Sequence, residues 1–180
     1  MSRGKYITLC LFTISLIAAP ATVRGEVVDS AAGGFTSRNS VNIAAPPREV
    51  YRVFLNVGQW WDPEHTYSGA SRNMYIQPIA NGCFCEKLPR GAGVQHMVVV
   101  YLEPGKTIRM IGALGPLQSM AASGSLTVSL SASNNGTSLE MTYAVGGYHP
   151  KGFQSLAPLV DKVLRVQIER LKKYVEKGKP

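Results

Sequence analysis

The last quarter of the chain carries a long apolar stripe, and this stripe restricts the possible folds more than any other feature. Apolar side chains recur at helical spacing for about five turns, at Leu156, Leu159, Val160, Val163, Leu164, Ile168, Leu171, Tyr174 and Val175. We expect Ser155 to cap this helix, Pro158 to lie in its first turn and Gly178 to end it. Because so long a stripe needs a broad apolar surface to pack against, the rest of the chain must form one.

A β-sheet is the only candidate for that surface. Residues 126–132 and 139–145 alternate between apolar and polar side chains on either side of Asn135-Gly136, a dipeptide typical of a two-residue hairpin loop. With that loop, the opposing pairs on one face are all apolar, for example Leu130 with Met141, and the other face is polar. Further strands are predicted at 35–43, 74–79, 83–88, 94–102 and 107–112.

Helical pattern interrupts the strands only once before the C-terminal helix. An apolar stripe from Val50 to Val57 predicts a helix that ends at Gly58, and Trp60 and Trp61 lie in a second short helix or turn that follows. The sequence therefore predicts an α+β fold. We expect a curved antiparallel sheet of about seven strands around one long C-terminal helix, with two short helices between strands one and two.

The N-terminus has the pattern of a secretory signal peptide. Arg3 and Lys5 precede an uncharged apolar run over 6–19, which is shorter than the roughly 20 residues that a membrane-spanning helix needs. The small residues of both 19–21 and 23–25 suit the signal peptidase, and we expect cleavage after the second group. The pattern predicts a secreted or periplasmic protein with no permanent membrane anchor.

The domain organisation follows from that cleavage. We expect a signal peptide at 1–25, a small and polar flexible lead-in at 26–34, and a single domain at 35–178. Removing 1–25 leaves 16 cations against 11 acids, so the formal charge falls from +8 to +5. The cations gather in the last helix without the interleaved aromatic residues that base stacking requires, and this pattern predicts no binding to nucleic acid.

Two cysteines remain after cleavage, Cys83 and Cys85. Residues two apart on a straight strand lie about 7 Å apart, at the edge of what a disulfide can bridge. We therefore expect packed thiols, or a strained and reducible bond, rather than a structural staple. The Cys-x-Cys spacing and the three scattered histidines match no recognised zinc pattern, so we predict no metal and no cofactor.

Glu86 is the acidic residue of greatest interest. It alternates with Phe84, so if one of these side chains points into the core the other does too, and a buried carboxylate needs a partner. We expect Arg109 to be that partner. A pair formed by Glu86 with His96 or His149 would be able to act as general acid and base.

The pattern does not decide the face of the sheet on which His96 lies, because both faces of its strand are apolar. An apolar outer face needs cover from another element or from a second subunit, so a homodimer is one expectation.

Four short segments resemble the SRPBCC superfamily: 45–51, Trp60-Trp61, 82–86 and 103–105. This group contains START domains, birch-pollen-allergen-like proteins, polyketide cyclases and homologues of the activator of the large heat-shock ATPase. The resemblance extends from Phe35 to Lys177. It implies a helix-grip fold with a cavity between sheet and helix that holds an apolar or amphipathic small molecule, and it implies no fixed set of catalytic residues.

Several residues are candidates to line or close such a cavity. The apolar loop at 112–118, which glycine and proline interrupt, is either an irregular turn or a lid over the cavity. The ligand-binding residues that we predict are Trp60, Trp61, Glu86, Met110, Leu114, Leu117, Tyr143 and Tyr148.

These observations favour an exported binding protein for an apolar or aromatic small molecule. An alternative is an enzyme of the cyclase or dehydratase type that uses Glu86 with a histidine. We favour the binding protein because isolated titratable residues in such cavities more often orient a ligand than catalyse a reaction. A third hypothesis is a protein-interaction module related to the heat-shock ATPase activators.

Overall fold

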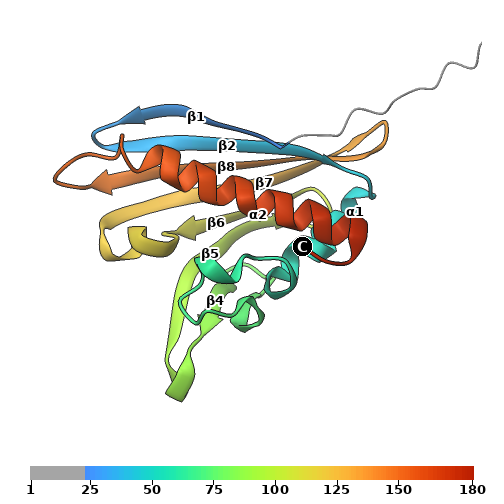
Figure 1. Cartoon of the computed structure of the whole chain (residues 1–180), viewed down its shortest axis with the longest axis horizontal. Helices are drawn as coiled ribbons and strands as arrows, with labels where there is room; N and C mark the ends of the chain where they lie inside the picture. The colour runs from blue at the N-terminus through green and yellow to red at the C-terminus, as the bar shows by residue number, and fades with distance from the viewer. Residues whose placement is uncertain (1–22) are drawn as a thin grey trace, which may run out of the picture.

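The computed structural model describes residues 23–180 (Figure 1). Within this range an eight-stranded antiparallel sheet has the order β1-β2-β8-β7-β6-β5-β4-β3. The strands are β1 (Arg24–Ala31), β2 (Gly34–Ile43), β3 (Met74–Ile76), β4 (Cys83–Lys87), β5 (Gly93–Glu103), β6 (Thr107–Gly112), β7 (Ala121–Ser133) and β8 (Gly136–Tyr148). Two α-helices, α1 (Pro47–Leu55) and α2 (Ala157–Lys177), complete the fold. The predicted α+β helix-grip architecture is confirmed, with one strand more than expected.

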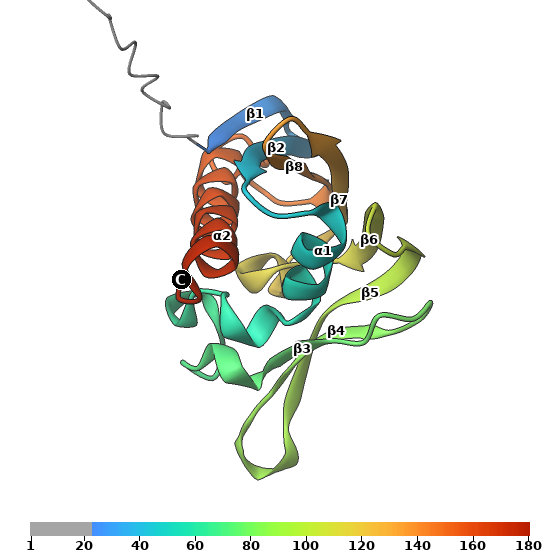
Figure 2. The ribbon, with the colours of Figure 1, turned by 90° about the vertical axis from the view of Figure 1, so that its right-hand side faces the viewer.

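The C-terminal helix lies along the concave side of the sheet, and Figure 2 shows the strands curling around it. Its packing partners are β2, β1 and α1. Its buried positions recur every three or four residues, at Ala157, Asp161, Leu164, Gln167, Ile168 and Leu171. The left-handed Gly178 ends the helix as predicted, but the residue at the N-cap is Leu156 and no side chain caps it, so the capping role of Ser155 is wrong.

The largest difference from the sequence prediction is at the N-terminal edge of the sheet. Residues 26–34 are not a flexible lead-in, because most of them belong to β1, which pairs antiparallel with β2. Val23 and Val27 are partly buried against the core, and Arg38 on β2 reaches the Glu26 carboxylate at 3.3 Å. Pairing with a well-formed neighbour holds this strand in place although its own apolar pattern is weak.

The predicted signal peptide lies almost entirely outside the described residues. The predicted cleavage after Gly25 would nevertheless remove the first two residues of β1. Cleavage after Ala21, the other site that the sequence offers, would leave the strand whole.

The hairpin of β7 and β8 has the predicted faces but a different register. Leu130 lies opposite Leu139 and Ser133 opposite Gly136, so the loop is Asn134-Asn135. Gly136 instead begins β8 with φ +136°, where an added Cβ would collide with the carbonyl oxygen of Ile43. The shift equals two residues, so each side chain keeps its face.

Smaller differences lie between α1 and β4. Three single-turn 3-10 helices at Val57–Gln59, Pro63–His65 and Ser71–Asn73 stand where a second helix or turn was predicted. The strand β3 stops at Ile76, which leaves Ile79 exposed in the following turn. The polar character of α2 disqualifies it as a membrane span, and no other helix within residues 23–180 is long and apolar enough.

Candidate functional site

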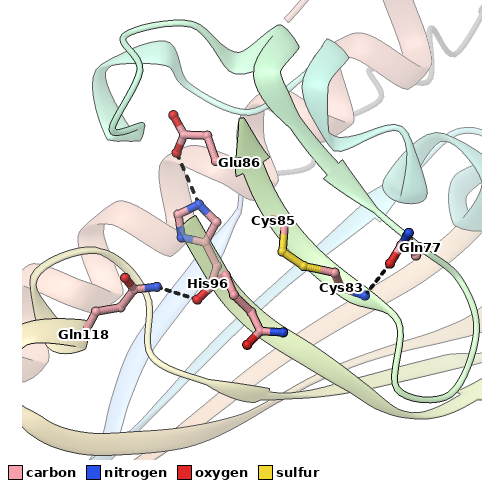
Figure 3. Close-up of a disulfide and its surroundings, with 7 residues drawn as sticks. Gln77, Cys83, Cys85, Glu86, His96 and Gln118 are labelled. Atoms are coloured by element: carbon pink, nitrogen blue, oxygen red, sulfur yellow. Dashed lines mark hydrogen bonds and ion pairs between the residues drawn. A yellow bond between two sulfur atoms is a disulfide. The ribbon is translucent and has the colours of Figure 1, made fainter. Parts of the chain in front are cut away.

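A buried carboxylate and a buried imidazole meet on two neighbouring strands. Glu86 on β4 is 1% exposed and His96 on β5 is 4% exposed. The Oε2 atom of Glu86 lies 3.2 Å from Nε2 of His96 (Figure 3). Of the two pairings that the sequence allowed for Glu86, the structure forms the one with His96.

A β-bulge turns His96 toward the inside of the sheet. Phe84 lies opposite Met97 and Cys85 opposite Gln95, so His96 is an extra residue with no partner across the ladder. Such a bulge changes the direction of a side chain without changing the rest of the strand. As a result His96 and its neighbour Met97 are both buried, which strict alternation along a strand does not allow.

The Glu86 carboxylate also holds the loop that follows the second 3-10 helix. It accepts hydrogen bonds from the backbone N–H groups of Tyr67 at 3.1 Å and Ser68 at 2.5 Å. Arg109, the partner predicted from the sequence, is wrong. Its side chain is exposed and its Nε donates to Thr127 Oγ1 at 2.9 Å, because Arg109 alternates with the inward-facing Ile108 and Met110.

The surroundings of the pair favour ionised Glu86 and neutral His96. Desolvation raises the pKa of Glu86, but the hydrogen bonds from Ser68, Tyr67 and His96 outweigh it and bring that pKa below its ordinary value. Desolvation lowers the pKa of His96 by more than the contact with Glu86 raises it. Neutral His96 then donates its Nε2–H to the carboxylate, which leaves Nδ1 as an acceptor.

The Nδ1 atom of His96 is buried and finds no hydrogen-bond partner within the described part of the chain. Most buried polar atoms in proteins are paired, and one that is not requires an explanation. In Figure 3 this nitrogen is on the side of the ring that faces away from Glu86. The Glu86 carboxylate thus fixes the tautomer of His96 in which Nδ1 carries no proton.

A hollow of about 390 Å³ lies beside His96. It is lined by residues 95–98 of β5, by residues 111–113 at the end of β6, and by Gln118, Ala122 and Ser123. The Gln118 amide donates to the carbonyl oxygen of Gln95 at 2.8 Å and so joins two sides of the hollow. Its volume is within the range of small-molecule pockets, and the polar residues Gln95, Gln118 and Ser123 form part of its wall.

None of the predicted ligand-binding residues lines this hollow, and most of them belong to the core. Five of them are buried in one apolar cluster: Trp60, Trp61, Met110, Leu117 and Tyr143. Both indole N–H groups are already bonded, that of Trp60 to Val53 O at 3.0 Å and that of Trp61 to His65 O at 3.0 Å. The Tyr143 hydroxyl donates to Gly112 O at 3.2 Å and accepts from Leu114 N at 3.3 Å.

The space between the sheet and α2 therefore differs from the expectation of a cavity. Large side chains that are fully buried, among them Tyr143, Phe153 and Ile168, occupy it. A second hollow, of about 420 Å³, is lined by residues of β1, β2 and β8, and Asp29 is the one titratable residue that lines it. Neither of these two hollows lies between the sheet and α2.

The loop at 112–118 closes over the region of the pair. Leu117 is buried, Leu114 is partly buried, and the Tyr67 hydroxyl donates to the Gly115 carbonyl oxygen at 2.9 Å. The other candidates do not join the site. Tyr148 is 69% exposed, and the Nδ1 of His149 lies 3.0 Å from the carbonyl oxygen of Gly152 in its own loop.

Three residues of the site had no signal in the sequence. Tyr67 and Ser68 belong to a polar segment without periodicity. Gln118 is a polar residue at the end of a loop that is otherwise mostly apolar. An aromatic contact path, by contrast, links predicted residues to the pair. Trp61 packs edge-on against Phe84 at 5.7 Å between ring centroids, and Phe84 packs against His96 at 5.2 Å.

Cys83 and Cys85 form a disulfide next to the pair, on the opposite face of β4 from Glu86 (Figure 3). Their Cα atoms are 5.4 Å apart, less than in a straight strand, and the contraction coincides with the bulge. Closing so short a ring contributes about 1.6 kcal/mol in the chain-entropy model, against about 3 kcal/mol for a 15-residue loop. No three His, Cys, Asp or Glu side chains gather as a metal site within residues 23–180.

The stability of the protein is expected to fall as the pH is lowered from 7 to 5. Unfolded His96 gains a proton near its ordinary pKa of about 6.5, but burial lowers that pKa in the fold. The unfolded chain therefore binds more protons in this range, and the slope from this residue is at most about 1.4 kcal/mol per pH unit. The contribution of Glu86 is lost only further down, below its own ordinary pKa.

Urea unfolding of the wild type and of His96→Gln at a series of pH values measures that slope. His96→Gln is expected to be flatter between pH 7 and 5. The matched control is His149→Gln, which removes a histidine away from the pair. An equal slope in wild type and His96→Gln would contradict the assignment of a neutral buried imidazole.

Comparison with known proteins identifies the fold class only. No family model matches the sequence, and no curated protein matches it. CalU16 from Micromonospora echinospora superposes with a TM-score of 0.57 over 90% of this chain and 87% of its own, at 15% identity. DynU16, a protein in the dynemicin biosynthetic locus, has a TM-score of 0.57 over 79% of this chain and 48% of its own, at 18% identity.

A protein from Rhizobium leguminosarum has a TM-score of 0.60 over 88% of this chain and 99% of its own, at 14% identity. Identities this low establish a shared fold and nothing more. The chain is thus similar in fold to proteins of the helix-grip type, and its chemistry has to be argued from its own residues.

Proposed function

We propose that this protein is a small-molecule-binding member of the SRPBCC superfamily whose ligand occupies the hollow beside His96. The observation that carries the proposal is the buried, unpartnered Nδ1 atom of a neutral histidine next to that hollow. A buried acceptor without a partner costs about 1–3 kcal/mol. A ligand that donates a hydrogen bond to this atom would remove that cost.

The walls of the hollow suggest the class of ligand. Met97, Val98 and Ala113 offer apolar contacts, Gln95, Gln118 and Ser123 offer polar groups, and His96 lies in the wall. The ionised carboxylate of Glu86 behind the imidazole disfavours an anion. These features fit an uncharged apolar or aromatic molecule that carries a hydroxyl or N–H group.

A pair of naphthalenes tests the binding mode by NMR. Titration with 2-naphthol is expected to shift the imidazole ¹⁵N resonances of His96, while 2-methoxynaphthalene, which has no donor, should bind at least about tenfold more weakly. His96→Gln should lose the preference for 2-naphthol, and His149→Gln, away from the hollow, should keep it. Equal affinity of the wild type for both compounds would contradict the proposed role of Nδ1.

An acid–base enzyme of the cyclase or dehydratase type is the second candidate. The specific observation in its favour is the carboxylate–imidazole pair itself, since an ionised Glu86 supports a neutral His96 that can accept a proton from a bound substrate. The similarity in fold to DynU16, which belongs to a biosynthetic locus, is compatible with it. A binding protein with Glu86→Gln should keep measurable ligand affinity, whereas an enzyme with this change should bind and lose turnover.

We also propose that the protein is exported. The charged and apolar pattern of residues 3–19 supports a signal peptide, and the pairing of β1 supports processing after Ala21 rather than after Gly25. Intact-mass measurement of the mature protein distinguishes the two sites.

A further inference from the structure

We propose that Cys83 and Cys85 are a reversible redox couple that exchanges electrons with thiols, and that the disulfide holds the bulge which places His96 against Glu86. The proposal concerns a second site, on the outer face of β4. It needs no ligand in the hollow, so it stands or falls independently of the proposed function.

The first argument is that this disulfide restrains only a short segment of the chain. It spans a single residue, Phe84, on a strand that the ladders to β3 and β5 already hold on both sides. Cys83 is further anchored by its backbone N–H, which donates to Gln77 Oε1 at 3.1 Å (Figure 3). Since so short a ring removes little freedom from the unfolded chain, reduction is expected to leave the fold intact.

The second argument is access for a thiol. Cys83 is partly exposed, whereas Cys85 is buried at 8% exposure. An incoming thiolate, from glutathione or from a reduced Cys-x-x-Cys protein, therefore attacks Sγ of Cys83. The bond between the two sulfur atoms breaks, and Cys85 leaves as a thiolate.

A cation lies on the same face of β4 as Cys85. Tyr75 lies directly across the ladder from Cys85, and the Lys87 ammonium lies 5.6 Å from the centre of the Tyr75 ring. Lys87 follows Cys85 by two residues and so shares its face of β4. Burial of Cys85 works against its departure as a thiolate, and Lys87 on the same face is the group proposed to offset that cost.

A second thiol completes the exchange. It attacks the sulfur of the first reductant in the mixed disulfide and releases Cys83 as a thiolate. The protein gains two electrons and, once both thiolates are protonated, two protons. The reductant leaves as a disulfide, either oxidised glutathione or a closed Cys-x-x-Cys.

The third argument is the link to the buried pair. Phe84, the residue between the two cysteines, packs against the imidazole of His96, with 5.2 Å between the centroids of their side-chain rings. Glu86 follows Cys85 directly in the chain. Because the bulge lies opposite Phe84 and Cys85, opening the ring releases the contraction of β4 at the position that orients both members of the pair.

Reduction of the native protein tests the couple. The protein is incubated in glutathione buffers of increasing reduced fraction, free thiols are alkylated, and intact mass gives the fraction carrying two labels. We expect complete and reversible reduction without denaturant, with a fall in the unfolding midpoint of no more than about 6 °C. A bond that is reduced only in denaturant, or a larger fall in the midpoint, would overturn the proposal.

Two variants locate the chemistry. Lys87→Gln should slow reduction by glutathione about two- to threefold, while Lys106→Gln, an exposed cation on the loop after β5, should not. The double variant Cys83→Ser with Cys85→Ser imitates the open ring. Its His96 imidazole resonances should match those of the reduced wild type and differ from those of the oxidised protein. Identical His96 resonances in all three forms would refute the link to the pair.

Discussion

Replacing Glu86 with alanine is expected to lower the free energy of unfolding by about 3–5 kcal/mol. Three donors lose their acceptor at once, namely the backbone N–H groups of Tyr67 and Ser68 and the Nε2–H of His96. The Glu86 side chain that they surround is 1% exposed, so its removal leaves these donors directed at a buried site. Urea unfolding at pH 7 measures the change.

Two further variants make that result specific. Glu86→Gln keeps one acceptor oxygen at the same place, so its loss should be smaller than that of Glu86→Ala. Glu140→Ala removes an exposed carboxylate from β8 and should leave stability unchanged within error. A Glu86→Ala protein within about 1 kcal/mol of the wild type would show that water or a loop movement replaces the lost acceptor.

Trp60→Ala is expected to cost a similar amount, about 3–5 kcal/mol, for a different reason. The Trp60 side chain is fully buried, and its ring lies 5.6 Å from those of Phe54 and Trp61 between centroids. Its N–H also bonds to the carbonyl oxygen of Val53 at 3.0 Å. Removing it leaves a cavity and takes one donor away from the end of α1, and urea unfolding measures the loss.

The same variant decides whether Trp60 binds the ligand, as the sequence suggested, or only packs. Trp60 is absent from the residues that line the hollow beside His96. The affinity of folded Trp60→Ala for 2-naphthol should therefore equal that of the wild type. Tyr75→Ala, at a partly exposed ring on β3, serves as the control with little effect on stability. A Trp60→Ala protein with normal stability and no 2-naphthol binding would show that Trp60 is part of the binding site.

The elements predicted correctly share one property: their evidence is local. Helical spacing over 156–175 predicted α2, and alternation over 126–145 predicted the buried face of the last hairpin. The inward direction of Glu86 followed from that of Phe84 by the same alternation. In each case the period of the backbone relates neighbours along the chain, so no distant contact is needed.

The predictions about the site depended on contacts between distant segments. Charge alone suggested Arg109 as the partner of Glu86, and the packing of the sheet decides that Ile108 and Met110 face inward while Arg109 faces outward. Trp60 and Tyr143 were placed around a cavity because large aromatic residues suit cavity walls and packed cores equally well. Only the positions of the surrounding strands and helices separate these two environments.

Neighbouring residues were enough to predict the order of the elements from β2 onward and the faces that most of them bury, because the periods of helices and strands relate residues close together in the chain. Tertiary structure alone decided that β1 joins the sheet, that the β7–β8 register moves by two, and that His96 turns inward. It also brought Cys83 and Cys85 within bonding distance. The physical reason is that a bulge interrupts the period of a strand, and whether a bulge forms depends on pairing and packing with segments that lie far away in the chain.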